Sequence, residues 1–296
     1  MIKYRNIRIG KKIRLHFSGS WMIVYLFMIA LVTFTSLPLI YMVSTAFKPI
    51  EELFVFPPRF FVRRPTLENF SDLMIAVGSS AVPFTRYIFN SFVTAAATVL
   101  LTLIVSSLGA YGLAKHKPAG SGIIFVIILG ALMFSTHVTQ IPSYMVVSSL
   151  GMINTYGALI IPKVAVAYNF FLMKQFAEQI PNEYLESARI DGANEITIFV
   201  KLVIPFLKPA WATLTVLSFI SNWNDYFTPL IFTSSQAMKT LPLALQTIAG
   251  GPATSSIGRA GAVAAATFLM TMPTIIIFTS MQAHVMETMV HSGIKA

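Results

Sequence analysis

A polar stretch at about 178–206 interrupts an otherwise hydrophobic chain, and its residues have the charge and spacing to bind another protein. Four of the eleven acidic residues lie within thirteen of its positions, at Glu183, Glu186, Asp191 and Glu195. A segment with this many charges is too polar to cross a bilayer, because each charge in lipid is costly. We therefore expect this polar element to fold outside the lipid, where a second protein can contact it.

The local sequence predicts that the polar element is a pair of short helices joined by a turn. Pro181 suits the start of a helix, where its missing N–H costs little. Asp191-Gly192 predicts the turn, because glycine adopts the left-handed conformation that ends a helix and aspartate can bond to its own backbone. The second helix is predicted by an apolar face at helical spacing, formed by Ile196, Phe199, Val200 and Val203. On this pattern alone, an amphipathic helix pair resting on the membrane with solvated charges fits as well.

Polar residues inside apolar stretches are the second group that could do chemistry. Asp225 and Lys163 are ionisable residues of this kind, and such groups are functional candidates by default. For Asp225, a buried hydrogen-bond partner that holds a helix break near Pro229 fits as well as a role in a transport path. Other residues that could line a path for a polar solute are Gln140, Tyr144, Tyr168, Asn169, Asn222 and Asn224. Hydrogen bonds between helices would explain each of them too.

Several kinds of chemistry have no residues to support them. No stretch reads G-x-x-x-x-G-K-[ST], the loop that cradles nucleotide phosphates. The five histidines have no paired spacing suited to a metal, the chain has no cysteine, and no catalytic serine or carboxylate arrangement is apparent. We therefore expect no enzyme activity, no metal and no cofactor in this chain, so any ATP and Mg would be bound by a separate one.

The composition indicates an all-α integral membrane protein. Of 296 residues, 55% are hydrophobic and 11% are charged, and the mean hydropathy is +0.72, whereas soluble domains are about a quarter charged. A membrane helix needs about 20 apolar residues. Six stretches qualify, at about 21–47, 86–114, 122–148, 157–177, 207–233 and 261–287. No ten-residue alternating segments of a β-barrel are present in the sequence. We expect one transmembrane domain over 1–296.

The distribution of Lys and Arg predicts that both termini are cytoplasmic. Six basic residues precede the first apolar stretch, at Lys3, Arg5, Arg8, Lys11, Lys12 and Arg14. With the N-terminus inside, thirteen Lys and Arg lie inside and seven outside, which satisfies the positive-inside rule. The basic tail is therefore interpreted as a cytoplasmic flank and not as a nucleic-acid-binding arm, and 21–47 is too long for a signal peptide. The polar element then lies in the cytoplasm.

The spacing within the polar element resembles a known family signature. Glu186-Ser187-Ala188, then Gly192, then nine residues and Leu202-x-Ile204-Pro205 resemble the pattern E-A-A-x-x-x-G-x₉-I-x-L-P. That signature belongs to permease subunits of binding-protein-dependent ABC importers. Further similarity to the carbohydrate-uptake branch, the MalG-like permeases, is found at Asp191-Gly192-Ala193, Phe199, Pro209-Ala210, 66–70, 87–91, 223–231 and 240–245. Ser187 replaces the usual alanine, and the C-terminal S-G-I-K-A departs from the usual G-A-V-K-G.

The resemblance implies a type I ABC importer fold of six helices with a coupling helix in the loop at about 178–206. In this family the helix seats in a groove on a separate ATPase subunit and passes its movement to the membrane helices. By analogy, Glu186 would be a charged contact, Ala188 a close-packing position and Gly192 the turn between the short helices. Ser187, Asp191 and Ala193 complete the coupling set implied by the motif.

The family also implies partners and a location. They are a related permease subunit, giving a heterodimer, two ATPase subunits that bind ATP and Mg, an extracytoplasmic solute-binding protein and membrane lipid, with no nucleic acid. The expected location is the bacterial cytoplasmic (inner) membrane, which the chain would cross several times.

A sugar is the solute that the resemblance implies. Sugars bind through hydrogen bonds and ring stacking, which suits the polar and aromatic residues named above. The first-loop sequence F-P-P-R-F-F-V-R-R-P-T-L-E-N-F resembles permeases for larger oligosaccharides, including those from acidic polysaccharides such as alginate or pectin. Arg59, Arg63 and Arg64 would suit an anionic ligand or partner, and anchoring at the membrane interface explains them equally well.

Two other functions fit parts of the sequence. An ion-gradient-driven secondary transporter or channel could use Asp225 and Lys163 as an ion relay, and it would show repeats relating its two halves. A membrane scaffold or anchoring subunit would use the polar element for docking without any transport.

Overall fold

The computed structural model describes residues 19–77, 82–249 and 260–293, and the described residues form helices and connecting turns without a strand. The first part contains α1 (Gly19–Ala46), α2 (Ile50–Leu53), α3 (Glu68–Val77), α4 (Phe84–Tyr111), the π-helical turn η1 (Gly112–His116), α5 (Ser121–Ala131) and α6 (Thr136–Ser149). Then come α7 (Tyr156–Val164), α8 (Ala167–Glu178), α9 (Asn182–Ile190), α10 (Glu195–Ile198) and the π-helical turn η2 (Phe199–Val203). The last part is α11 (Ile204–Trp223), α12 (Phe227–Phe232), η3 (Gln236–Met238), α13 (Leu241–Ala249) and α14 (Ala260–Gly293).

Four continuous helical stretches are long and apolar enough to cross a membrane. They are Met22–Ala46, Phe84–His116, Glu195–Trp223 and Ala260–Met286. The number rises to as many as six if two bent helix pairs, α5 with α6 and α7 with α8, each count as one span. The described residues therefore confirm the all-helical prediction, and they contain between four and six candidate spans.

The stretches predicted at 122–148 and 157–177 are not straight helices. The axes of α5 and α6 differ by 110°, and those of α7 and α8 by 46°. At the first break, the Ser135 side chain accepts a hydrogen bond from the His137 N–H at 3.4 Å and starts α6 as a new helix. At the second break the Val164 carbonyl accepts from the Thr102 hydroxyl of α4 at 3.4 Å, so the neighbouring helix replaces a missing backbone bond. Side-chain partners of this kind are not visible in hydropathy.

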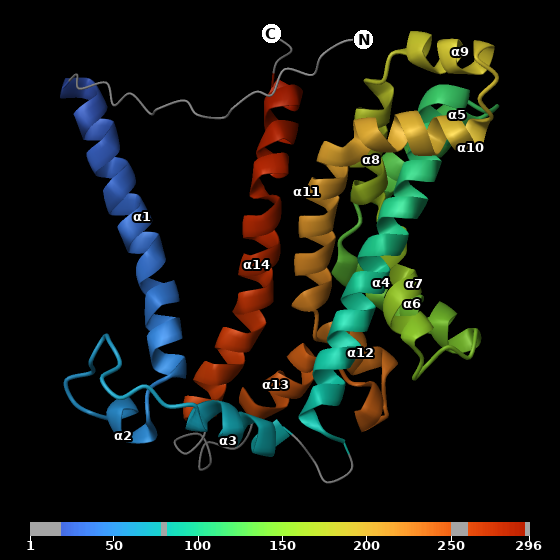
Figure 1. The fold of residues 1–296 in the computed structure, drawn as a ribbon. Helices are drawn as coiled ribbons and strands as arrows, with labels where there is room; N and C mark the ends of the chain where they lie inside the picture. Colours follow the sequence, from blue (N-terminus) through green and yellow to red (C-terminus); the bar gives the residue numbers. More distant parts are fainter. Residues whose placement is uncertain (1–18, 78–81, 250–259, 294–296) are drawn as a thin grey trace.

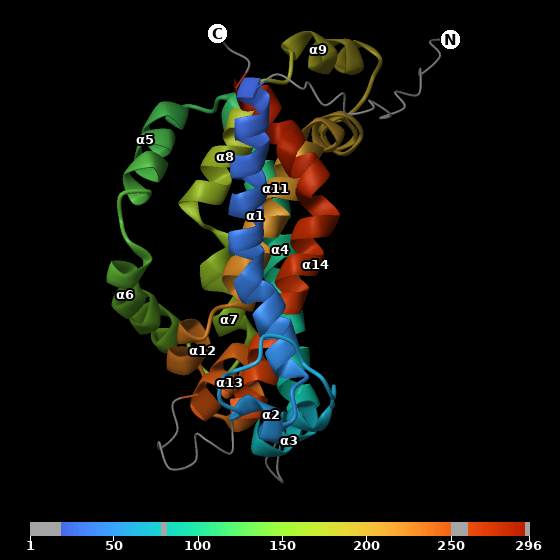
Figure 2. The same ribbon diagram turned by 90° about the vertical axis from the view of Figure 1, so that its left-hand side faces the viewer.

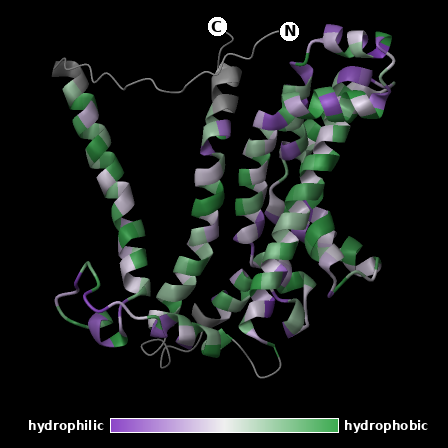
Figure 3. Ribbon diagram, in the orientation of Figure 1, coloured by the Kyte–Doolittle hydropathy of each residue, from purple (hydrophilic) through white to green (hydrophobic). Residues whose placement is uncertain are grey.

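The core is built around α4 and α11, which pack against each other and against α8, and α11 also packs against α14 (Figures 1 and 2). The buried face of α4 combines apolar side chains such as Val99 and Leu103 with a row of polar ones, namely Asn90, Ser91, Thr94, Thr98, Thr102, Ser106 and Ser107. Ser107 accepts from the Trp211 indole N–H at 2.8 Å, and Asn90 accepts from the Tyr156 hydroxyl at 2.7 Å. Most residues of the long helices are hydrophobic (Figure 3), and many of their large apolar side chains are exposed. This arrangement is typical of packing in lipid, where small and polar groups join the helices.

Helix α5 stands apart from this core (Figure 2), and none of its residues is buried. Its contacts run to α8, where the Phe125 ring stacks on Phe171 with centroids 6.3 Å apart. The Lys174 ammonium lies 3.7 Å from the centre of the same Phe125 ring. A single aromatic side chain therefore provides the ring contacts that join α5 to the rest of the described chain.

The described part of the first loop packs against the end of α1. The Thr66 hydroxyl accepts from the Glu68 N–H at 3.2 Å and begins α3. Asn69 on α3 is buried and donates to the carbonyls of Ala46 and Lys48 at 2.9 and 2.6 Å. These bonds join α3 to the end of α1.

The two ends of the bundle differ in character. The beginning of α1 and the end of α14 lie at the same end as α9 and α10, whereas α2, α3, α12 and α13 lie at the opposite end (Figure 1). The polar element therefore shares an end of the bundle with the beginning of α1 and the end of α14, and the cytoplasmic position of this end remains a prediction. The basic tail from Lys3 to Arg14 and the last three residues of the S-G-I-K-A sequence lie outside the described residues.

Candidate functional site

The polar element folds as two short helices joined by a turn. Helix α9 ends at Ile190, and Gly192 follows with φ = +81°, a left-handed conformation that side-chain-bearing residues rarely adopt. The Ala193 N–H returns to the Ala188 carbonyl at 2.9 Å, and the Asn194 side chain accepts from the Thr197 N–H at 2.8 Å to begin α10. The turn predicted from Asp191-Gly192 is therefore present, and Gly192 is the residue that makes it possible.

The coupling set is divided between solvent and core. Glu186, Ser187, Asp191 and Gly192 are exposed on α9 and its turn. Ala188 and Ala193 are partly covered and pack against the buried core cluster. Leu185 anchors the helix with 2% of its surface exposed. The element thus offers an outer face of charged and polar groups with exposed apolar residues such as Ile190 among them, while its small residues keep it close to the bundle.

Glu195 connects the polar element to the end of α4. Its Oε1 accepts from Arg189 Nε of α9 at 2.9 Å, and its Oε2 accepts from the Tyr111 hydroxyl at 2.8 Å. The His116 Nε2 lies 3.3 Å from the same Oε2. Hydrogen bonding to Glu195 raises the pKa of Arg189 above its ordinary value, so the guanidinium remains charged. One carboxylate thereby joins α9, α10 and α4, a link that sequence reasoning missed.

The apolar face predicted for the second short helix is wrong in part. Ile196 and Val200 are 76% and 52% exposed, whereas Ile198 and Val203 are buried. The reason is the π-helical turn η2, whose wider winding breaks the 3.6-residue period on which the prediction rests.

A cavity of about 610 Å³ lies between α6, α7, α8, α11 and α12. Of the seven residues predicted to line a solute path, six line this cavity, namely Gln140, Tyr168, Asn169, Asn222, Asn224 and Asp225. Their role in a solute path remains a prediction. Tyr144 is not among the lining residues, and its ring stacks on Phe232 of the cavity wall at a centroid distance of 6.1 Å. Lining residues that sequence reasoning did not single out include Thr139, Ser143, Ser218, Ser221 and Thr228. The cavity wall is therefore rich in hydroxyl and amide groups.

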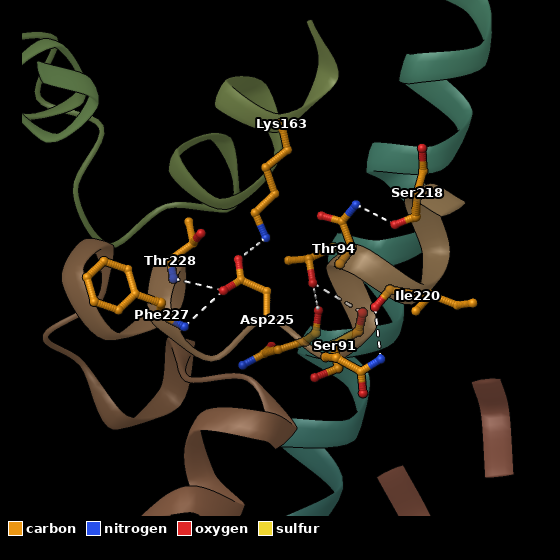
Figure 4. A network of polar contacts seen from close by, with 11 residues as sticks. Ser91, Thr94, Lys163, Ser218, Ile220, Asp225, Phe227 and Thr228 are labelled. Atoms are coloured by element: carbon orange, nitrogen blue, oxygen red, sulfur yellow. Dashed lines mark hydrogen bonds and ion pairs between the residues drawn. The ribbon is translucent and has the colours of Figure 1, made fainter. Parts of the chain in front are cut away.

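Asp225 and Lys163 form a direct ion pair in the cavity wall (Figure 4). The Asp225 Oδ2 contacts Lys163 of α7, while Oδ1 accepts from the N–H groups of Phe227 and Thr228 at 2.9 and 3.1 Å. Asp225 thus caps the first turn of α12, which contains Pro229, and it lines the cavity at the same time. The structure is therefore compatible with both interpretations of Asp225, as a hydrogen-bond partner at the helix break and as a residue of a transport path.

Two amide side chains of the cavity wall use their nitrogen atoms for hydrogen bonds within their own helix. Asn222 Nδ2 donates to the Ser218 carbonyl at 2.7 Å, and Asn224 Nδ2 donates to the Ile220 carbonyl at 3.0 Å. Tyr168 and Tyr226 leave 47% and 41% of their surfaces exposed. Side-chain oxygens and aromatic rings are therefore available to a solute that carries many hydroxyl groups.

Long apolar helices, a polar helix pair at one end and a polar cavity among the helices together define a membrane permease. Residues 103–290 match the family described as the inner membrane component of binding-protein-dependent transport systems, and the chain belongs to this family.

Individual relatives carry more specific names. The chain is 33% identical over 184 residues to the arabinooligosaccharides transport system permease protein AraQ of Bacillus subtilis (strain 168), covering 62% of this chain and 65% of that protein. It is 30% identical over 227 residues to the polygalacturonan/rhamnogalacturonan transport system permease protein YtcP of the same organism, covering 77% of each. The alignment with AraQ thus spans slightly less than two thirds of that relative.

A solved structure has a similar fold. It is described as a bacterial ABC transporter involved in the import of the acidic polysaccharide alginate. The match has a TM-score of 0.78 at 24% sequence identity and covers 91% of this chain and 99% of the other. This likeness shows that the chain has an ABC permease fold.

Proposed function

We propose that the chain is the permease subunit of an ATP-driven, binding-protein-dependent importer of oligosaccharides. The observation that carries the proposal is the cavity among the helices, whose wall combines amides, hydroxyls and tyrosine rings. These are the groups that bind sugars, and the relatives are named for the transport of saccharide chains. ATP and Mg are bound by separate ATPase subunits in this scheme.

In the proposed topology the chain forms one domain that crosses the bacterial inner membrane six times, with each bent helix pair counted as one span. The end that contains α9 is cytoplasmic, because thirteen Lys and Arg then lie inside and seven outside. The cap formed by α2, α3 and α13 then faces the solute-binding protein.

In the proposed mechanism α9 is the coupling helix and seats in a groove of an ATPase subunit. Glu186 supplies a charged contact, and Gly192 sets the angle between α9 and α10. When the two ATPases close on ATP, the movement of α9 reaches α4 through the Glu195 carboxylate and its bonds to Arg189 and Tyr111. Alternating access follows as α4 and α11 move with a related permease subunit that completes the pathway.

An ion-gradient-driven transporter is not favoured by the family to which the chain belongs. The Lys163–Asp225 pair also argues against an ion relay, because Asp225 is held by two backbone N–H groups as well as by Lys163. A relay group must exchange its partner during each cycle, and these bonds oppose that exchange.

Reconstitution of the complete complex tests the proposal. Proteoliposomes containing this chain, its partner permease and the ATPases should take up labelled oligosaccharide only with ATP and a sugar-loaded binding protein. Uptake that follows an imposed proton or sodium gradient without ATP would contradict the proposal and support the secondary transporter. Membrane insertion without any uptake under either condition would support the scaffold.

A further inference from the structure

The charges in the cavity wall cancel. Among the described residues that line the cavity, Lys163 and Asp225 are oppositely charged and His137 is the other ionisable nitrogen base. The Lys163 and Asp225 side chains are 22% and 19% exposed and contact each other directly. The rest of the polar wall is made of amides and hydroxyls. The pair therefore offers a solute a strong dipole but no net charge.

The second oxygen of Asp225 keeps the carboxylate in place. Oδ1 accepts from the backbone N–H groups of Phe227 and Thr228, so both carboxylate oxygens have partners (Figure 4). An anionic solute that displaced Asp225 from Lys163 would leave a largely buried carboxylate without its counter-charge, although the two backbone N–H bonds would remain. An anionic solute that used a remaining N–H of Lys163 instead would lie beside the Asp225 carboxylate. In either position the Asp225 charge would repel the anion.

A neutral sugar meets neither obstacle. Its hydroxyl groups can accept from the free N–H bonds of Lys163 and donate to Asp225 without breaking the pair. The rings of Tyr168 and Tyr226 stand at the same cavity and are partly exposed. The exposed arginines of the first loop, Arg59 and Arg63 among them, are not part of the described cavity wall and supply no counter-charge there.

We infer that this chain's side of the pathway selects neutral oligosaccharides over those built from uronic acids, and that Asp225 sets this selectivity by neutralising Lys163. The inference rests on the proposed function and narrows its substrate class. The inference distinguishes between the saccharides for which the two relatives are named. Arabino-oligosaccharides are neutral, whereas polygalacturonan carries one carboxylate on each galacturonate unit.

Direct binding to the assembled complex tests the inference without the filter of the binding protein. The permease–ATPase complex in nanodiscs, held with a non-hydrolysable ATP analogue, is titrated with labelled arabinotriose, xylotriose, maltotriose and trigalacturonate. At least one of the neutral trisaccharides should bind about tenfold or more tightly than trigalacturonate. The uronate binds more weakly because it must separate the ion pair or lie beside the Asp225 charge. Tighter binding of trigalacturonate overturns the inference, and so does the absence of binding by every trisaccharide.

Two variants show whether Asp225 is responsible. Asp225→Asn keeps an oxygen that can cap α12 but frees the Lys163 charge, so trigalacturonate should gain about tenfold in affinity relative to the neutral sugar. Lys163→Met should weaken trigalacturonate further, and the double variant should restore the wild-type order. An unchanged ratio in Asp225→Asn overturns the assignment. If that variant does not assemble, the double variant decides, because a loss of trigalacturonate affinity relative to the wild type would mean that Lys163 itself binds the uronate.

Uptake separates this inference from the proposed function. In the proteoliposome assay, ATP-dependent uptake of trigalacturonate but of no neutral oligosaccharide leaves the importer function standing and overturns the selectivity. If no saccharide of either class enters with ATP and binding protein, the proposed function itself is wrong.

Discussion

The Tyr111 hydroxyl donates a hydrogen bond to Glu195 Oε2 at 2.8 Å, although the two residues are 84 positions apart in sequence. Tyr111 is the last residue of α4, and Glu195 is the first residue of α10. The Tyr111 ring also lies 5.6 Å from that of Phe199 in η2. The contact therefore joins the helix that supplies the core of the bundle to the element that is proposed to bind the ATPase.

Glu195→Gln should uncouple ATP hydrolysis from transport. The amide keeps the size of the side chain but removes the charge that holds Arg189, and a half-exposed ion pair of this kind contributes about 0.2–1 kcal/mol. We expect ATPase activity that no longer responds to sugar-loaded binding protein, with uptake reduced about tenfold or more. Tyr111→Phe should have a smaller effect in the same direction.

Tyr41→Phe is the matched control for the Tyr111 variant, because Tyr41 is an exposed tyrosine of α1 far along the chain from α10. Coupling should be normal in this control. Normal coupling in Glu195→Gln would show that the Glu195 contacts only stabilise the fold.

Gly192→Val should abolish uptake while the chain still inserts into the membrane. A β-branched residue at φ = +81° is strained by about 1–2 kcal/mol or more, so the turn opens and α9 loses its angle. A Cβ at this position meets no other atom within 4 Å, so the effect comes from the backbone conformation and not from a clash. Gly192→Asn is the control, since asparagine tolerates the left-handed region and should keep much of the uptake. Equal loss in both variants would point to the surface of the turn instead of its conformation.

Asn90→Leu should lower stability without touching the polar element. Asn90 is fully buried, donates to the carbonyls of Ala237 and Lys239 at 2.8 Å each, and accepts from the Tyr156 hydroxyl. Leucine leaves these three groups unpaired, which should cost about 2–4 kcal/mol. Tyr156→Phe removes one of the bonds and should cost about 1 kcal/mol. Thermal unfolding of the purified complex measures both, and a smaller loss for Asn90→Leu than for Tyr156→Phe would contradict the assignment.

Gly261→Val should weaken the packing of α3 against α14. A Cβ at Gly261 of α14 would overlap the side-chain oxygen of Asn69, whose amide bonds to the end of α1. We expect lower thermal stability and faster proteolysis of the first loop. Gly130→Ala in α5 is the control, because a Cβ there meets nothing within 4 Å and alanine favours a helix. Proteolysis that is no faster in Gly261→Val than in the control would remove the argument.

Hydropathy and spacing were enough to predict the helical class, the polar element and six of the residues that line the cavity. They succeeded because a charged turn such as Asp191-Gly192 is specified locally, and because amides such as Asn169 and Asn222 stand out in an apolar stretch. The coupling roles of Glu186 and Gly192 remain predictions.

Contacts between distant segments could not be predicted in this way. The pairing of Lys163 with Asp225 depends on how α7 packs against the break between α11 and α12. The bend between α5 and α6 depends on a helix cap at Ser135 inside an apolar stretch. A single polar residue changes the mean hydropathy of such a stretch little, so hydropathy does not reveal the break. The π-helical turn η2 changes which side of a helix faces inward, so Ile198 is buried where the regular period predicts Ile196.

Helix α5 has a consequence for how the subunit is maintained in a cell. All eleven of its residues leave surface uncovered, and Phe125 alone makes its ring contacts with α8. Most of this helix must gain its packing from lipid or from another subunit. The stability of the chain then depends on the concentration of its partner, as in any protein that is stabilised by association. We expect the chain produced alone to be degraded faster than the chain produced together with its partner, so that the supply of one subunit limits the amount of the other.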